Sequence, residues 1–173
     1  SNGASDGMKV AINVTAMILA LVALVAFIDW ILGLGGMFCY NYVPGCSHLA
    51  FLSHLSLKLI LGKVFSIFAI IIGVPLHDAS TVGALMGTKL VLNEMVAYVD
   101  LTHVAQSLNP KSFMIASFAL CSFGNFGSIA IQIGGIGELA PNQKKNLARL
   151  GLRALICGTL SCYLSAAIVG VLL

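Results

Sequence analysis

The chain has 173 residues, of which 59% are hydrophobic and 9% charged, and its mean hydropathy is +1.01. Soluble domains carry roughly 25% charged residues, so this composition excludes a soluble domain, and its low polarity also excludes a disordered chain. The net charge of +3 is too small to indicate a nucleic-acid partner. The composition therefore predicts an integral membrane protein whose apolar surface faces the lipid bilayer.

Four long apolar segments predict membrane-spanning helices, because about 20 apolar residues cross the core of a bilayer. They cover residues 8–34, 55–75, 111–136 and 146–173. A group of glycines that begins at Gly33 is predicted to end the first helix, and the Pro44-Gly45 turn lies in the loop that follows. No segment shows the alternation typical of a strand, so we expect an all-α membrane protein.

Most residues of the segment 77–104 are apolar, but the segment also contains charged residues. It either spans the membrane once or forms a re-entrant helical hairpin. Basic residues favour the cytoplasmic side, so the basic loop at 144–153 predicts a cytoplasmic loop there and a C-terminus outside. A hairpin also places Lys58 and Lys63 on the cytoplasmic side, and this favours the hairpin, although local propensity alone predicts a single helix.

Two sites break the rules for a helix in a bilayer. The first is Glu94, because an ionisable side chain in a membrane is costly and is by default a functional candidate. Asn93 is predicted to cap a new helix that starts at Glu94. The structural alternative is an ion pair between Lys89 and Glu94. No nucleophile–base pair or metal cluster is evident in the sequence, so we do not expect an enzyme.

The second site is the glycine-rich stretch Phe123-Gly124-Asn125-Phe126-Gly127-Ser128, which predicts a break in the third helix near residues 124–127. Polar residues recur around it every three or four positions, namely Ser117, Cys121, Asn125, Ser128 and Gln132. A broken helix that lines a substrate site is one interpretation. The other is that these side chains only form hydrogen bonds between packed helices.

These same motifs carry a family resemblance. Residues 87–98, with the sequence GTKLVLNEMVAY, and residues 123–135, with FGNFGSIAIQIGG, closely resemble the C-terminal domain of the concentrative nucleoside transporters. Residues 147–155 and 5–14 resemble it too, and the similarity extends over nearly the whole chain. We therefore expect residues 1–173 to be one half of an inverted-repeat transporter, with the N-terminal half missing from this sequence.

The resemblance implies symport of nucleosides across the cell membrane, coupled to Na⁺ or H⁺, by a homotrimer. It assigns ribose binding to Glu94 near the hairpin tip and to Asn125 and Ser128 on the broken helix, with Phe123 as an apolar wall nearby. It implies no cofactor, and it places most ligands of the coupling ion in the missing half. The alternative function is a non-transporting helical membrane assembly or regulatory module.

Overall fold

The computed structural model describes residues 2–42 and 55–173, and every regular element in these ranges is a helix. This confirms the predicted all-α fold, whereas the Pro44-Gly45 turn lies outside the described residues. The α-helices are α1 (Asn2–Tyr42), α2 (Leu57–Ile71), α3 (Leu76–Val91), α4 (Glu94–Val104), α5 (Pro110–Leu120), α6 (Phe126–Leu139) and α7 (Lys144–Leu172). Short 3₁₀ turns, η2 (Ala105–Ser107) and η3 (Pro141–Gln143), precede α5 and α7.

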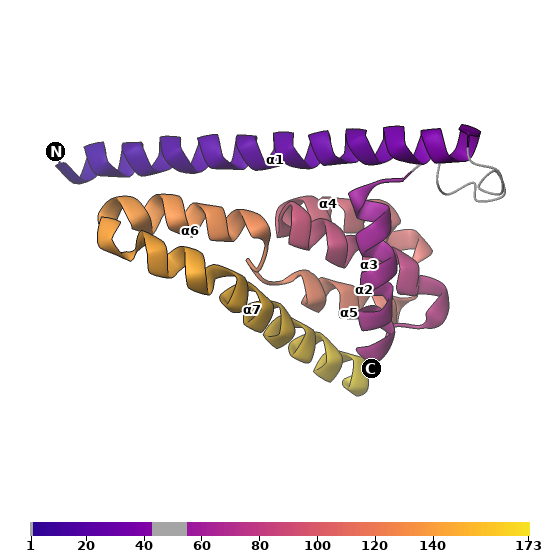
Figure 1. Ribbon diagram of the computed structural model, residues 1–173. Helices are drawn as coiled ribbons and strands as arrows, with labels where there is room; N and C mark the ends of the chain where they lie inside the picture. The colour runs from indigo at the N-terminus through magenta and orange to yellow at the C-terminus, as the bar shows by residue number, and fades with distance from the viewer. Residues whose placement is uncertain (1, 43–54) are drawn as a thin grey trace.

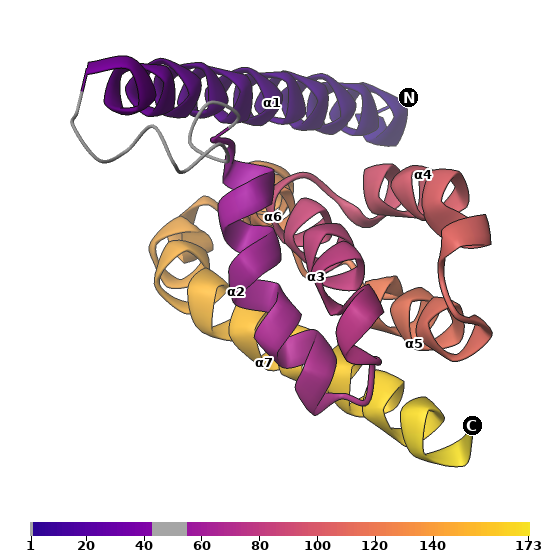
Figure 2. The ribbon, with the colours of Figure 1, turned by 90° about the vertical axis from the view of Figure 1, so that its right-hand side faces the viewer.

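Helix α1 is a single long rod along one side of the other helices (Figure 1 and Figure 2). It packs mainly on α6 and leaves large apolar side chains such as Leu19 and Trp30 exposed, as expected for a surface that faces lipid. The prediction that glycines end this helix at Gly33 is wrong, since the helix continues to Tyr42. A helical glycine costs only about 1 kcal/mol relative to alanine, and in lipid a broken backbone would lose more in unpaired hydrogen bonds.

Two helical segments of the described chain, Gly3–Tyr42 and Pro141–Leu172, are long and apolar enough to cross a membrane. Helix α2 has 15 residues and is therefore about 22 Å long, against a hydrocarbon core of about 30 Å. The segment predicted at 55–75 thus forms a shorter helix than a straight crossing requires. The predicted third segment is divided into α5 and α6.

Helices α2 and α3 pack against each other more extensively than any other pair of helices in the described residues. A Cβ atom added to Gly83 would lie 2.5 Å from the backbone nitrogen of Ser66 and 2.6 Å from the carbonyl oxygen of Gly62. The two backbones therefore touch, which is the way in which small residues allow helices to approach in membranes. Gly73, with φ of +104°, makes the tight turn between them, because a residue with a side chain rarely adopts that conformation.

Helices α3 and α4 pack against each other as the two arms of a hairpin. The helical pattern stops at Leu92, and Asn93 then caps α4, as predicted, by accepting a hydrogen bond of 2.9 Å from the backbone N–H of Val96. At the open end, the backbone N–H of Asn109, just after the second arm, donates to Asp78 Oδ2 at 3.0 Å. The chain thus returns to where α3 began. A single helix over 77–104 is wrong, and the depth of the hairpin in a bilayer remains a prediction.

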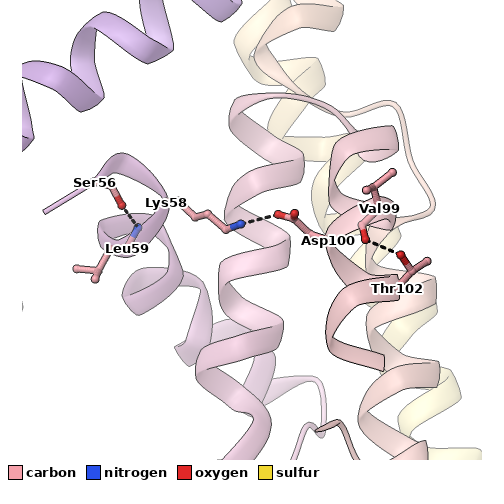
Figure 3. A network of polar contacts seen from close by, with 6 residues as sticks. All are labelled: Ser56, Lys58, Leu59, Val99, Asp100 and Thr102. Atoms are coloured by element: carbon pink, nitrogen blue, oxygen red, sulfur yellow. Dashed lines mark hydrogen bonds and ion pairs between the residues drawn. The ribbon is translucent and has the colours of Figure 1, made fainter. Parts of the chain in front are cut away.

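An ion pair connects the outer arm of the hairpin to α2. Figure 3 shows Lys58 reaching from the first turn of α2 to Asp100 on α4, where its Nζ lies 2.5 Å from Oδ2. The same first turn is fixed by Ser56, whose hydroxyl oxygen accepts a hydrogen bond from the backbone N–H of Leu59. Asp29 on α1 accepts another from the backbone N–H of Leu57 at 2.6 Å. Together these contacts fix the start of α2 relative to α1 and α4.

The contact of α2 with α3 predicts that Gly83→Ala destabilises the protein. The new methyl group meets backbone atoms, which cannot rotate away, so the helices must separate at a cost of about 1–3 kcal/mol. Thermal unfolding in detergent should show a lower midpoint. Gly158→Ala is the matched control, because its Cβ position on α7 has nothing within 4 Å. An unchanged midpoint for Gly83→Ala would contradict the observed packing.

Candidate functional site

The helix break between α5 and α6 covers residues 121–125, slightly before the predicted position of 124–127. Helix α5 ends at Leu120, and α6 begins at Phe126 with Asn125 as its cap. Gly127, predicted to lie in the break, is helical. The break ends where it does because the Asn125 side chain supplies the acceptor that the first free backbone N–H groups of a helix require.

The amide of Asn125 has both of its ends engaged. Its Oδ1 accepts hydrogen bonds from the backbone N–H of Ser128 at 2.7 Å and from the Ser128 hydroxyl at 3.0 Å. Its Nδ2 donates to Glu94 Oε2 at 3.1 Å. Because the cap needs the oxygen, the nitrogen must face the carboxylate. Helix capping on α6 therefore orients the group that contacts the start of α4.

All four predicted site residues line one cleft of about 370 Å³, a size within the roughly 300–1,000 Å³ of small-molecule sites. Asn125 is 4% exposed, whereas Phe123 is 78% exposed. Residues that the sequence analysis missed complete the wall, among them Ile18 and Val22 of α1. These two residues line the cleft because α1 lies close to it. Nothing in their sequence positions predicts that α1 approaches the cleft.

Two helix N-termini border this cleft, those of α4 and α6. Each N-terminus carries a partial positive charge, which favours an anion in its first turn. Glu94 is the first residue of α4 and occupies that place. Its Oε2 accepts the hydrogen bond that Asn125 Nδ2 donates. The cleft thus combines a carboxylate acceptor, an amide and a hydroxyl beside an apolar ring.

Two predicted features are corrected by the structure. Lys89 forms no ion pair with Glu94 among the described residues, because its Nζ instead donates to Ser122 Oγ at 2.6 Å. The polar residues predicted as one helical stripe are divided by the break. Asn125, Ser128 and Gln132 line a second cleft of about 280 Å³, whereas Ser117, in α5, lines neither this cleft nor the first.

The polar groups of the first cleft can recognise a ligand through hydrogen bonds. A carboxylate accepts hydrogen bonds from two hydroxyl groups, an amide donates and accepts, and a serine hydroxyl can do either. The described residues contain no group of three or more His, Cys, Asp or Glu side chains that could hold a metal ion. The arrangement suits a small ligand that has adjacent hydroxyl groups and an apolar part.

Known proteins resemble this chain over almost its whole length. The family model described as the C-terminus of the Na⁺ dependent nucleoside transporters matches residues 1–170. The chain is 47% identical to the uncharacterized transporter YutK of Bacillus subtilis and 39% identical to the nucleoside permease NupC of Helicobacter pylori. It is 34% identical to human solute carrier family 28 member 3. The matches cover 98–99% of this chain but only 39%, 39% and 26% of those relatives.

Solved structures of the transporter CNTnw share this fold. A variant in an intermediate state matches with a TM-score of 0.81 and 41% identity, over 99% of this chain and 41% of that chain. CNTnw in an inward-facing, substrate-bound state matches with a TM-score of 0.72 and 40% identity, over 98% of this chain and 39% of that chain. The chain belongs to the Na⁺ dependent nucleoside transporter family, in which it corresponds to the C-terminal domain.

Proposed function

We propose that this chain is the C-terminal part of a cation-coupled symporter that carries nucleosides across the cell membrane, and that the 370 Å³ cleft binds the ribose. The observation that carries the proposal is the hydrogen bond from Asn125 Nδ2 to Glu94 Oε2. It places a carboxylate and an amide together in one cleft, beside the exposed ring of Phe123. The family assignment supports the nucleoside as substrate.

The chemistry of a ribose suits this arrangement. Its 2′ and 3′ hydroxyl groups are adjacent, and the carboxylate of Glu94 can accept a charge-assisted hydrogen bond from each of them. The second N–H of the Asn125 amide and the hydroxyl oxygen of Ser128 remain available to the rest of the sugar. Phe123 offers an apolar face to the sugar or the base. In the absence of a nucleoside, water molecules take these hydrogen bonds.

The remaining parts of the site are proposed to lie outside this chain, which spans about 40% of the bacterial relatives. Sites in transporters with inverted repeats form at the interface between the repeats. The other repeat would contact the base and supply most ligands of the coupling ion, Na⁺ or H⁺. A homotrimer is proposed as the functional assembly, in agreement with the family resemblance.

The orientation in the membrane is also a proposal. The basic residues around the start of α7, which include Lys145 and Arg149, favour the cytoplasm. One crossing by α7 then puts the C-terminus outside. Asp78 and Asn109 are joined by a hydrogen bond, so the two open ends of the hairpin must lie on the same side of the membrane. Because the broken helix α5–α6 starts there and ends at the cytoplasmic loop, that side is the outside.

The ribose assignment predicts that Glu94→Gln weakens uridine binding by about tenfold to several hundredfold. Hydrogen bonds to a charged group contribute roughly 1.5–3 kcal/mol each, and about 1.4 kcal/mol corresponds to a factor of ten. Isothermal titration of the purified full-length transporter gives the Kd. Replacing uridine by 2′-deoxyuridine should cost the wild type more than it costs Glu94→Gln, because both changes remove the same interaction.

Asp6→Asn is the matched control, because it makes a comparable exchange of a carboxylate for an amide at an exposed position of α1 outside the cleft. It should keep the wild-type preference for uridine over 2′-deoxyuridine. Equal penalties for the deoxy ligand in wild type and Glu94→Gln would contradict the ribose assignment. A full-length protein that binds no nucleoside, with Asn125→Ala equally inert, would favour the non-transporting assembly instead.

The orientation predicts the labelling of single cysteines in a background from which native cysteines are removed. Cysteines that replace His77 and Thr102 should react with a membrane-impermeant maleimide added from outside. A cysteine in place of Lys145 should react only from the cytoplasmic side. Labelling of positions 77 and 102 from opposite sides would refute the re-entrant hairpin, and labelling of all three from one side would refute the crossing by the broken helix.

A further inference from the structure

Lys89 is a buried ammonium group for which neither the cleft nor the ribose assignment gives a role. Its side chain lies in the last turn of α3 and is 0% exposed. Within the described residues it forms no ion pair, and its Nζ donates a hydrogen bond of 2.6 Å to Ser122 Oγ. A buried charge is strongly disfavoured unless something of opposite sign lies close to it. The surroundings of Lys89 must therefore supply negative charge.

The carboxylate of Glu94 attracts Lys89 electrostatically, and the C-terminal end of α5 is a second source of negative charge. The end of a helix carries roughly half a negative charge on its last carbonyl groups, and Ser122 lies two residues beyond α5. Protein donors bind several of these carbonyls. The Tyr98 hydroxyl donates to the carbonyl of Ser117, and the Cys162 thiol donates to those of Phe118 and Ala119. The partial negative charge that remains at this helix end favours a cation next to it.

An aromatic ring adds to the stabilisation. Lys89 Nζ lies 5.9 Å from the centre of the Tyr163 ring, within the distance of about 6 Å at which a ring face attracts a cation. The ammonium thus has a hydroxyl oxygen, a helix C-terminus and an aromatic ring as neighbours. In broken helices of transporters, such a C-terminal end is where a small coupling cation is commonly coordinated. Here a cation from the protein itself lies beside that end.

The Lys89 contact also connects the two helix breaks. Lys89 lies five residues before Glu94, and Ser122 lies three residues before Asn125. The hydrogen bonds of Lys89 with Ser122 and of Asn125 with Glu94 therefore join the same two segments at two neighbouring points. If the first bond is lost, the segment 121–125 can shift relative to α4, and Asn125 then moves away from Glu94.

We propose that the Lys89 ammonium is a built-in cation of the broken helix. It takes the place beside the C-terminal end of α5 that a small monovalent cation would otherwise fill, and it positions the segment 121–125 for ligand binding. The inference rests on the proposed function insofar as the ligand is a nucleoside. Lys89 is a positioning residue, because it acts through Ser122 and lines none of the three clefts around the break.

The test is chemical rescue of Lys89→Ala in the full-length transporter. This variant should bind uridine at least about tenfold more weakly, since a hydrogen bond from a charged group is lost. Propylammonium chloride fits the space that the side chain leaves and should restore binding in a concentration-dependent way at constant Na⁺ and ionic strength. 1-Propanol has nearly the same volume without the charge and should not restore it. Lys89→Met fills the space and should respond to neither compound.

Recovery with 1-propanol equal to that with propylammonium would overturn the proposal, because Lys89 would then serve only in packing. Wild-type affinity in Lys89→Ala would overturn it as well. If Lys89→Ala does not fold, Ser122→Ala keeps the lysine and removes its acceptor. That variant should bind uridine several-fold more weakly, and its backbone amides at 121–125 should exchange faster with deuterium. Unchanged exchange and affinity in Ser122→Ala would refute the positioning role.

The exchange measurement separates this proposal from the proposed function. A wild-type protein that binds no uridine would refute the nucleoside assignment, whereas faster exchange at 121–125 in Ser122→Ala would still support the contact made by Lys89. Conversely, uridine binding by the wild type together with unaltered binding by Lys89→Ala would leave the nucleoside assignment intact and refute the role of Lys89.

Discussion

The hydrogen bond between Asn125 and Glu94 joins the two places where a helix of this chain is interrupted. Each interruption starts a new helix, whose first backbone N–H groups lack partners within the helix and need a cap. Asn93 and Asn125 provide these caps. The cap of α6 leaves the Asn125 nitrogen directed at the first residue of α4. The requirement to satisfy the backbone thus creates the polar centre of the cleft.

The rest of the fold keeps these two interruptions in register. The backbone contact at Gly83 fixes α3 against α2, and the ion pair of Lys58 with Asp100 fixes α4 to the start of α2. The bond from Asn109 to Asp78 closes the open end of the hairpin. Helix α1 then covers the cleft with apolar side chains, while its outer surface remains exposed. A site made of two helix ends needs such support because neither end is rigid by itself.

Several features were accessible from single residues and short patterns. Asn93 and Glu94 mark a helix start through capping chemistry, and the glycines around Asn125 mark a break, so local rules predict both within a few residues. The same local rules are wrong at Gly33, where the weak helix propensity of glycine does not end the helix. They also predict an ion pair between Lys89 and Glu94, because the sequence shows only which residues are close along the chain.

The sequence by itself determined the membrane environment, the all-helical class, the family and the four residues around the cleft, since composition, capping motifs and family motifs are local. Only the tertiary structure decided that Glu94 meets Asn125, that Lys89 reaches Ser122, and that Ile18 and Val22 wall the cleft. Each of these contacts joins segments at least 31 residues apart. These contacts form only when the helices approach closely. That approach depends on packing at positions such as Gly83, and the sequence does not show which residues such a position packs against.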